Sequence, residues 1–214
     1  MNIVEKTIEF VKFTLAGAEG GHDWWHIHRV LENTRSIASG ESADLLTSEL
    51  AALLHDIADP KFHNGNEKKG SLIAFDFLNK QSVSPVSINS IINIIENISF
   101  SKEITGKTSK SIELQVVQDA DRLDAMGAIG IARAFNYGGY KNRLLFDPEN
   151  PPKKYSNSQE YRNSNSPTIN HFYEKLLLLK GLMNTETGRK MAEERHEFML
   201  LFLKHFHEEW NAKI

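Results

Sequence analysis

Apolar residues recur at helical spacing along most of the chain, and strict alternation of apolar and polar residues is nowhere sustained. Asp23 is placed to cap one helix, and Ser84 followed by Pro85 is typical of the start of another. The pattern therefore predicts an all-α fold. The helices we expect lie at about residues 3–15, 24–37, 45–58, 67–79, 84–98, 111–139 (as two helices, or as one that bends near Gly127 and Gly130), 168–183 and 185–210.

One segment, residues 137–167, departs from this pattern because it is rich in Asn, Ser, Pro and Gly and has no clear period. A loop of about thirty residues is uncommon in a compact domain and is usually functional or disordered. Its aromatic and basic residues suit a lid over a polar ligand, and a plain surface excursion is the alternative. We expect one domain over residues 1–214, with a core at about 20–136, this loop at 137–167 and two long C-terminal helices at 168–210.

Composition narrows the classes of function. The 28 acidic and 25 basic residues give a formal net charge of −3, which argues against general attraction to nucleic acid or to an anionic membrane. The chain has no Cys, which excludes disulfides, thiolate metal sites and a Cys nucleophile. No stretch approaches the roughly 20 apolar residues of a membrane span. We therefore expect a soluble cytoplasmic protein.

The segment "AALLHDIADPKF" places His55 and Asp56 inside a helix that is apolar nearly all round. Such a helix is central in its bundle, so both side chains are expected to be buried. A buried carboxylate must be hydrogen-bonded, paired or bound to a cation. The partner that His55 and Asp56 require must therefore be sought in other segments of the chain.

Two other segments offer complementary groups. "HDWWHIHRVL" places His26 one turn after Asp23 and one turn before Arg29. "QDADRLDAMG" places three carboxylates, Asp119, Asp121 and Asp124, in an otherwise apolar segment, where they repel each other unless a positive group lies among them. A divalent cation is the simplest such group. Spacing alone does not decide which of the three carboxylates it would contact.

Three motifs together, "DWWHIHRV", "LLHDIAD" and "DADRLDAMGAIG", resemble those of the HD-domain metal-dependent phosphohydrolases, with the greatest likeness to the small bacterial HD hydrolases of the YpgQ/YedJ type. The resemblance extends over nearly the whole chain. It implies a compact helical bundle and a metal held by His26, His55, Asp56 and Asp121. Asp121 is preferred among the three carboxylates because it holds the position of the family's last ligand, and Asp119 or Asp124 would then orient a ligand.

The resemblance also implies roles around the metal. Asp59 is the candidate general base or water-orienting residue, and pairing with Lys61 or capping of a loop is the alternative. The candidate phosphate contacts are basic. Arg29 could equally hold Asp119 or Asp124 in a buried ion pair. Lys175, with His171 and Lys180, could reach the site, but a solvated charged stripe is the favoured interpretation of these three residues. These candidates are Arg122, Arg29, Lys61 and Lys175.

Two imidazoles and two carboxylates, with positions left for water, favour one six-coordinate Mn²⁺, with Co²⁺, Ni²⁺, Fe²⁺ or Mg²⁺ as alternatives. The expected function is hydrolysis of nucleotides, with conversion of (d)NTP to (d)NMP and pyrophosphate as the specific form that the resemblance implies. A phosphodiesterase or 5′-nucleotidase with the same site, and a non-catalytic nucleotide-sensing module, are the alternatives. The expected partner is a small nucleotide, and the sequence leaves homodimer formation open.

Overall fold

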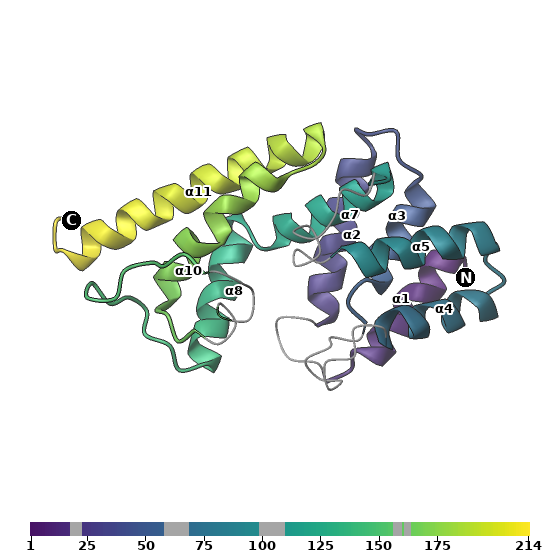
Figure 1. Cartoon of the computed structure of the whole chain (residues 1–214), viewed down its shortest axis with the longest axis horizontal. Helices are drawn as coiled ribbons and strands as arrows, with labels where there is room; N and C mark the ends of the chain where they lie inside the picture. Colours follow the sequence, from purple (N-terminus) through teal and green to yellow (C-terminus); the bar gives the residue numbers. More distant parts are fainter. Residues whose placement is uncertain (18–22, 58–68, 99–109, 156–159, 161–163) are drawn as a thin grey trace. The chain divides into compact units, whose positions relative to one another are not determined.

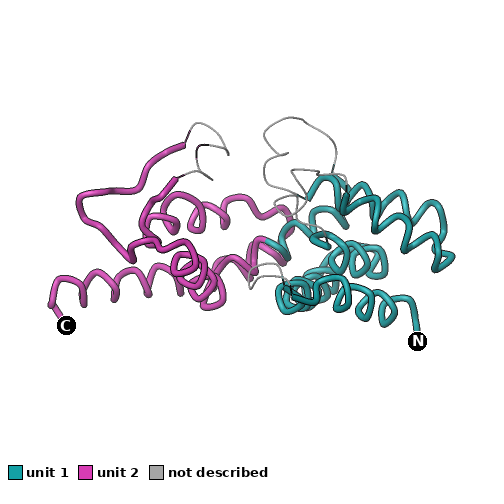
Figure 2. The backbone as a smooth tube through the Cα atoms, turned by 90° about the horizontal axis from the view of Figure 1, so that it is seen from below, with its two compact units in different colours: residues 1–121 teal, residues 122–214 magenta. Residues whose placement is uncertain are grey.

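A computed structural model describes residues 1–17, 23–57, 69–98, 110–155, 160 and 164–214. Helices supply the regular structure of these residues, and no strand occurs among them, which confirms the predicted all-α fold. The helices group into two compact units, residues 1–121 and residues 122–214 (Figure 2). The expectation of one domain over residues 1–214 stays a prediction. The division falls inside a helix, α7, which therefore contributes to both units.

The first unit is built around one central helix (Figure 1). α3 packs against α1, α2 and α5, and α4 packs against α5. All residues of α3 from Thr47 to Leu54 are buried, which explains why this helix is apolar nearly all round. The helices of this unit are α1 (Ile3–Thr14), α2 (Trp24–Ala38), α3 (Leu45–Leu54), α4 (Lys69–Lys80), α5 (Pro85–Asn97) and most of α7 (Ile112–Asp124).

Side-chain caps fix where several of these helices begin. Asp23 caps α2, Asp44 caps α3, and Ser84 caps α5 with Pro85 as the first helical residue. Each capping oxygen accepts a backbone N–H that has no partner within the helix, and such a cap typically stabilises a helix by about 1 kcal/mol. The starts predicted from Asp23 and Ser84 are confirmed.

The end of α3 differs from the prediction. The sequence predicted a helix to about residue 58, whereas the α-helix ends at Leu54 and His55 is its C-cap residue. The His55 ring is the physical reason, because its Nδ1 lies 2.7 Å from the Ala52 carbonyl oxygen and takes the place of a backbone donor. His55 and Asp56 therefore lie on a turn rather than within the helix.

α7 and α8 (Gly127–Tyr140) are separate helices, one of the two arrangements predicted for this region. Gly127 has a φ of +65°, a left-handed conformation that favours glycine at the end of a helix. A side chain here would also be crowded, since an added Cβ would lie 3.1 Å from Cγ of Arg195. The Arg195 guanidinium donates to the Leu123 carbonyl over 2.6 Å and so satisfies an acceptor at the end of α7.

The second unit contains α8, α10 (Thr168–Glu174), η2 (Leu176–Leu182) and α11 (Glu186–Trp210). α11 packs against α8 and η2, and α10 packs against α8 and η2. The prediction of one long helix over residues 168–183 is wrong, because the chain changes to a 3₁₀-helix after Lys175, whose φ is −143°. Side chains three residues apart eclipse in a 3₁₀-helix, which lets Leu176 and Leu179 share a buried face.

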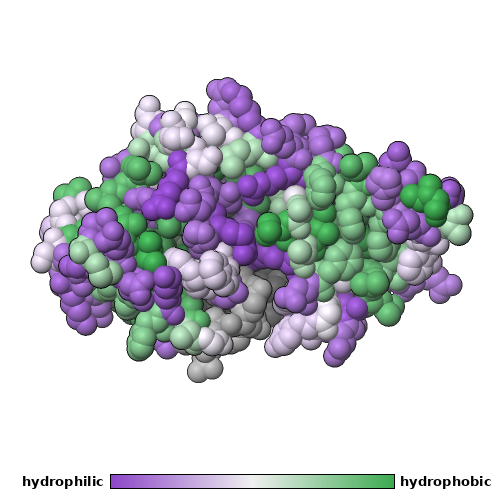
Figure 3. Space-filling model, turned by 180° about the vertical axis from the view of Figure 1, so that it is seen from behind, coloured by the Kyte–Doolittle hydropathy of each residue, from purple (hydrophilic) through white to green (hydrophobic). Residues whose placement is uncertain are grey.

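α8 continues to Tyr140, into the segment predicted as a loop from residue 137. Residues 141–155 then contain neither helix nor strand. Part of the predicted loop lies outside the described residues, so its role as a lid stays a prediction. On the face of the molecule shown in Figure 3, hydrophilic and hydrophobic side chains are interspersed. None of the helices in the described part of the chain is long and apolar enough to span a membrane.

Candidate metal centre

His26 lies in the first turn of α2 and is held there by the cap of that helix. Oδ1 of Asp23 accepts the backbone N–H of His26 over 2.9 Å. This bond fixes the start of α2 three residues before the imidazole, which gives the "DWWH" spacing a structural reason. The His26 side chain is only 3 % exposed and therefore has a defined direction.

His55 is oriented by the bond that ends α3. A carbonyl oxygen can only accept, so the contact of Nδ1 with the Ala52 carbonyl requires Nδ1 to carry the proton. In the neutral imidazole, Nε2 then presents a lone pair. A backbone carbonyl behind the far nitrogen is a common way to set the tautomer of a metal-binding histidine.

Asp121 is positioned by the packing of α7 within the first unit. Asn33 of α2 donates through Nδ2 to the carbonyl of Ala120 over 3.2 Å. Gln118, only 1 % exposed, donates through Nε2 to the carbonyl of Asn97 at the end of α5 over 3.0 Å. These two bonds fix how α7 is rotated about its axis and how far it is shifted along that axis near Asp121.

The structure brings together the four side chains that the resemblance implies as metal ligands. Nε2 of His26 lies 3.6 Å from Oδ1 of Asp121 and 4.0 Å from Oδ2 of Asp56, and Nε2 of His55 lies 3.9 Å from Oδ1 of Asp121. One ligand atom from each of His26, His55 and Asp56 lies within 4.8 Å of the others. When two ligand atoms each lie about 2.1 Å from the same metal ion, they are roughly 3.0 Å apart at adjacent positions and roughly 4.2 Å apart at opposite positions. The three distances fall in this interval.

The structure distinguishes the three carboxylates that spacing left equivalent. Asp121 lies beside both imidazoles. Asp124 belongs to the second unit, where its Oδ2 accepts from Arg133 over 2.5 Å. Asp119 is fully buried. Asp121 therefore has an atom placed toward both His26 and His55.

Exposure is uneven across the four side chains. The histidines are only 3 % and 5 % exposed, whereas the Asp121 side chain is 41 % exposed. The imidazoles thus form a buried base, and the carboxylate of Asp121 lies on the side open to solvent. A metal site that acts on a substrate needs such an open side, whereas a purely structural site is usually closed by its ligands.

The candidate phosphate contacts that the structure describes lie on three different elements. Arg29 is half-buried one turn after His26 on α2. Arg122 is only 6 % exposed and donates to the Leu182 carbonyl, a contact inside the second unit. Lys175 follows α10 as its C-cap residue. Asp59 and Lys61 lie outside the described residues.

Comparisons with known proteins agree with this arrangement. A family model described as "HD domain" matches residues 24–126, which include all four clustered side chains. The chain is 39 % identical over 203 residues to YpgQ of Bacillus subtilis, an uncharacterized protein, and the alignment covers 94 % of this chain and 90 % of that relative. The chain belongs to the HD-domain superfamily of metal-dependent phosphohydrolases.

Solved structures of other HD proteins share the fold over the whole chain. An HD-superfamily hydrolase from Bacillus thuringiensis is 44 % identical with a TM-score of 0.79, covering 98 % of this chain and 97 % of that chain. B. subtilis YpgQ in complex with ADP is 36 % identical with a TM-score of 0.75, covering 96 % of this chain and 94 % of that chain. The HD family assignment therefore rests on sequence, fold and the His-Asp cluster together.

The surroundings of His171 were not anticipated from the sequence. Lys175 was a candidate phosphate contact, and His171 was considered with it as part of a solvated charged stripe. Burial, followed by the positive charges of Lys175 and Arg143, lowers the pKa of His171 to about 3. No local pattern signals this, because Arg143 and His171 are far apart in sequence.

Proposed function

We propose that this HD protein is a divalent-metal-dependent nucleotide phosphohydrolase that converts (d)NTP to (d)NMP and pyrophosphate. The convergence of His26 and His55 with Asp121, on a buried base with an open side, is the observation that carries the proposal. YpgQ, which resembles this chain over nearly its full length, has been solved in complex with ADP, and this supports a nucleotide as the ligand.

The proposed ligands are His26, His55, Asp56 and Asp121, which would hold one metal ion. Two nitrogen and two oxygen donors favour Mn²⁺, with Co²⁺, Ni²⁺, Fe²⁺ and Mg²⁺ as alternatives. When bound, the metal lowers the pKa of a coordinated water and polarises a phosphoryl oxygen. The protein's own contribution is orientation, since the bond from His55 Nδ1 to the Ala52 carbonyl keeps Nε2 aimed at the cluster.

Asp59 remains the proposed residue that accepts a proton from the attacking water or orients it. It follows Asp56 by three residues in the sequence. We keep Arg29, Lys61 and Lys175 as proposed phosphate contacts. For Arg122, the bond to the Leu182 carbonyl supports an anchoring role in the second unit more strongly than direct contact with phosphate.

The test is a matrix of metals and nucleotides with identification of the products. Protein loaded with each metal is incubated with nucleoside triphosphates, diphosphates and monophosphates and with cyclic dinucleotides. Pyrophosphate and a monophosphate are the expected products. Absence of turnover with every metal, from folded protein, would refute the proposal. Inorganic phosphate from a monophosphate, or a monoester from a diester, would instead identify a nucleotidase or a phosphodiesterase.

Variants separate the assigned roles. His55→Ala and Asp56→Ala should abolish metal binding, whereas Asp59→Ala should retain the metal and slow turnover. Calorimetric titration with Mn²⁺ measures the first effect, and the rate of pyrophosphate release measures the second. Loss of metal binding in Asp59→Ala would show that the role given to Asp59 is wrong. Tight nucleotide binding without hydrolysis by any metal form would indicate a non-catalytic sensing module.

A further inference from the structure

Asp121 lies in the last turn of α7, the part of this helix that depends most on contacts from outside it. α7 ends at Asp124, three residues after Asp121. The last four carbonyls of an α-helix have no partner in the regular helical pattern, and a terminal turn frays easily. Two of these carbonyls accept the N–H groups of the two residues that follow the helix, over 3.0 Å each. The remaining support of this turn comes from side chains of the second unit.

Arg133 of α8 holds the final residue of α7. Its Nη1 donates to Oδ2 of Asp124 over 2.5 Å and to the backbone carbonyl of the same residue over 3.3 Å. The Asp124 side chain is only 2 % exposed, so water screens this charge-assisted bond little. One guanidinium therefore fixes both the side chain and the backbone of Asp124.

Arg195 of α11 holds the residue before it. Its Nη1 donates to the Leu123 carbonyl over 2.6 Å. The stem of Arg195 passes close to Gly127, where an added Cβ would lie 3.1 Å from its Cγ. A cation at this end of a helix also interacts favourably with the helix dipole. The backbone just after α7 thus leaves the room that Arg195 needs to reach the helix.

A third contact starts from α7 itself. Arg122, the residue after Asp121, donates through Nη1 to the Leu182 carbonyl at the end of η2. Residues 122, 123 and 124 are therefore each bonded to a different element of the second unit, η2, α11 and α8. Contacts on three successive residues define the rotation of the turn as well as its position, because the three residues point in different directions around the helix axis.

We propose that Arg133 and Arg195 are positioning residues of the metal centre and act on it through Asp121. Oδ1 of Asp121 lies 3.6 and 3.9 Å from Nε2 of His26 and of His55. The Asp121 side chain is 41 % exposed, so neighbouring side chains cover little of it and the backbone of α7 sets its place. Bonds at Gln118 and Ala120 hold that backbone before Asp121, and the arginines hold it afterwards. The inference rests on the proposed function only for the role of Asp121 as a metal ligand.

The first test is calorimetric titration with Mn²⁺ of variants that lose the guanidinium and keep an unbranched stem. Arg195→Met should lower the affinity by about 10- to 100-fold, the loss typical when a residue behind a metal ligand is replaced. Arg133→Met is combined with Asp124→Asn, so that no buried carboxylate loses its cation, and should have a similar effect. Arg195→Lys, which keeps a charged donor, should recover part of the affinity.

Hydrogen exchange of the metal-free protein supplies a second measurement. In Arg195→Met, the backbone N–H groups of residues 124–126 should exchange at least about tenfold faster than in the wild type, because the last turn of α7 then opens locally. The N–H groups of α3 should keep their wild-type rates. A purely structural role would instead raise exchange throughout the protein.

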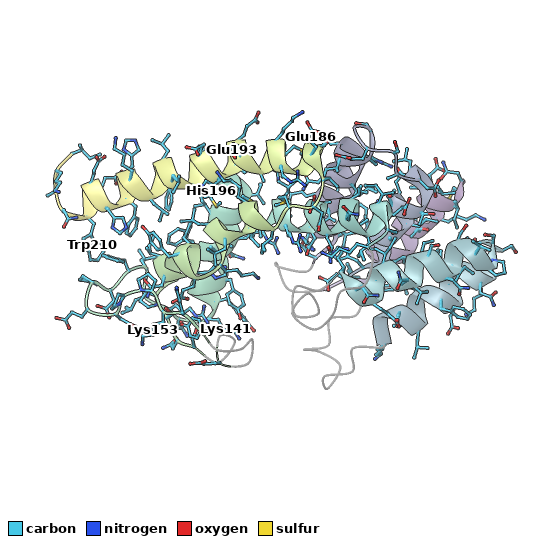
Figure 4. The ribbon with its side chains drawn as sticks, turned by 45° about the horizontal axis from the view of Figure 1, so that its top comes forward. Lys141, Lys153, Glu186, Glu193, His196 and Trp210 are labelled. Carbon is cyan, nitrogen blue, oxygen red and sulfur yellow. The ribbon has the colours of Figure 1, made fainter. Side chains whose placement is uncertain are left out.

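Arg189→Met is the matched control. Arg189 and Arg195 both lie on α11 between Glu186 and His196, which are labelled in Figure 4. Arg189 also donates to backbone carbonyls, those of Met183 and Asn184, over 3.3 and 2.6 Å, and these residues precede α11. Its replacement should leave both the Mn²⁺ affinity and the exchange of residues 124–126 unchanged.

The outcomes separate this inference from the proposed function. It is overturned if Arg195→Met binds Mn²⁺ as the wild type does, if exchange at residues 124–126 does not change, or if Arg189→Met loses as much affinity. Hydrolysis by the wild type together with any of these results overturns the inference alone. Weaker Mn²⁺ binding in Arg195→Met, without hydrolysis by any metal form of the wild type, overturns the proposed function alone. A wild type that binds no divalent metal overturns both.

Discussion

Replacement of His171 should make the protein less sensitive to acid. The pKa of His171 is lowered from 6.5 to about 3 in the folded protein, by burial first and by Lys175 and Arg143 next. Between these two values the unfolded chain binds a proton that the folded protein does not bind. Stability therefore falls as the pH is lowered from about 6.5 toward 3. One pKa unit corresponds to about 1.4 kcal/mol, and at pH 6.5 half of the unfolded chains already carry this proton. Acidification from pH 6.5 to 4.5 therefore removes up to about 2.3 kcal/mol through this residue.

This value is an upper limit, because part of the His171 surface is exposed and solvent reduces the effect. Urea unfolding of the metal-free wild type and of His171→Gln at pH 6.5 and 4.5 measures the difference. His171→Gln should lose less stability than the wild type over this interval, whereas His205→Gln, at a half-exposed position on α11, should behave as the wild type does. Equal losses in the wild type and in His171→Gln would refute the reasoning.

Three further predictions concern the metal centre and the end of α7. Asp121→Asn should lower Mn²⁺ affinity by more than about 10- to 100-fold, which is the loss typical when a residue that only hydrogen-bonds to a metal ligand is replaced. An unchanged affinity in calorimetric titration would contradict the assignment of Asp121 as a ligand. Mn²⁺ at about 100 times its Kd should stabilise the wild type by about 2.7 kcal/mol and leave His55→Ala unaffected, as thermal unfolding would show. Gly127→Ala should cost about 1–2 kcal/mol in urea unfolding, because residue 127 has a φ of +65°; an unaltered midpoint would show that this turn adapts.

The periodic pattern was sufficient for the fold class and for the helix starts, because caps such as Asp23 and Ser84 act locally. The helix ends were harder to predict. α3 ends at Leu54 because the His55 ring, rather than a backbone N–H, bonds to the Ala52 carbonyl. Sequence analysis placed His55 within the helix and had no means of detecting that competition.

The candidate site shows the same division between local and long-range information. Their spacing made Asp119, Asp121 and Asp124 equal candidates for a metal ligand. The direction in which each side chain points depends on how α7 is rotated against its neighbours. Bonds from Asn33 and to Asn97, both remote in sequence, fix that rotation. Docking of Leu144 and Leu145 against the start of α10 likewise depends on backbone bonds between distant segments, which no local pattern predicts.

The course of α7 has a consequence for how this protein can be divided. The boundary between the compact units falls after Asp121, three residues before the helix ends. A chain cut at that boundary would have Asp121 as its last residue. It would lose Arg122, Leu123 and Asp124 of α7, and its new terminal carboxylate would add a negative charge to the residue whose side chain lies beside His26 and His55. A fragment intended to carry the metal centre must therefore extend past Asp124.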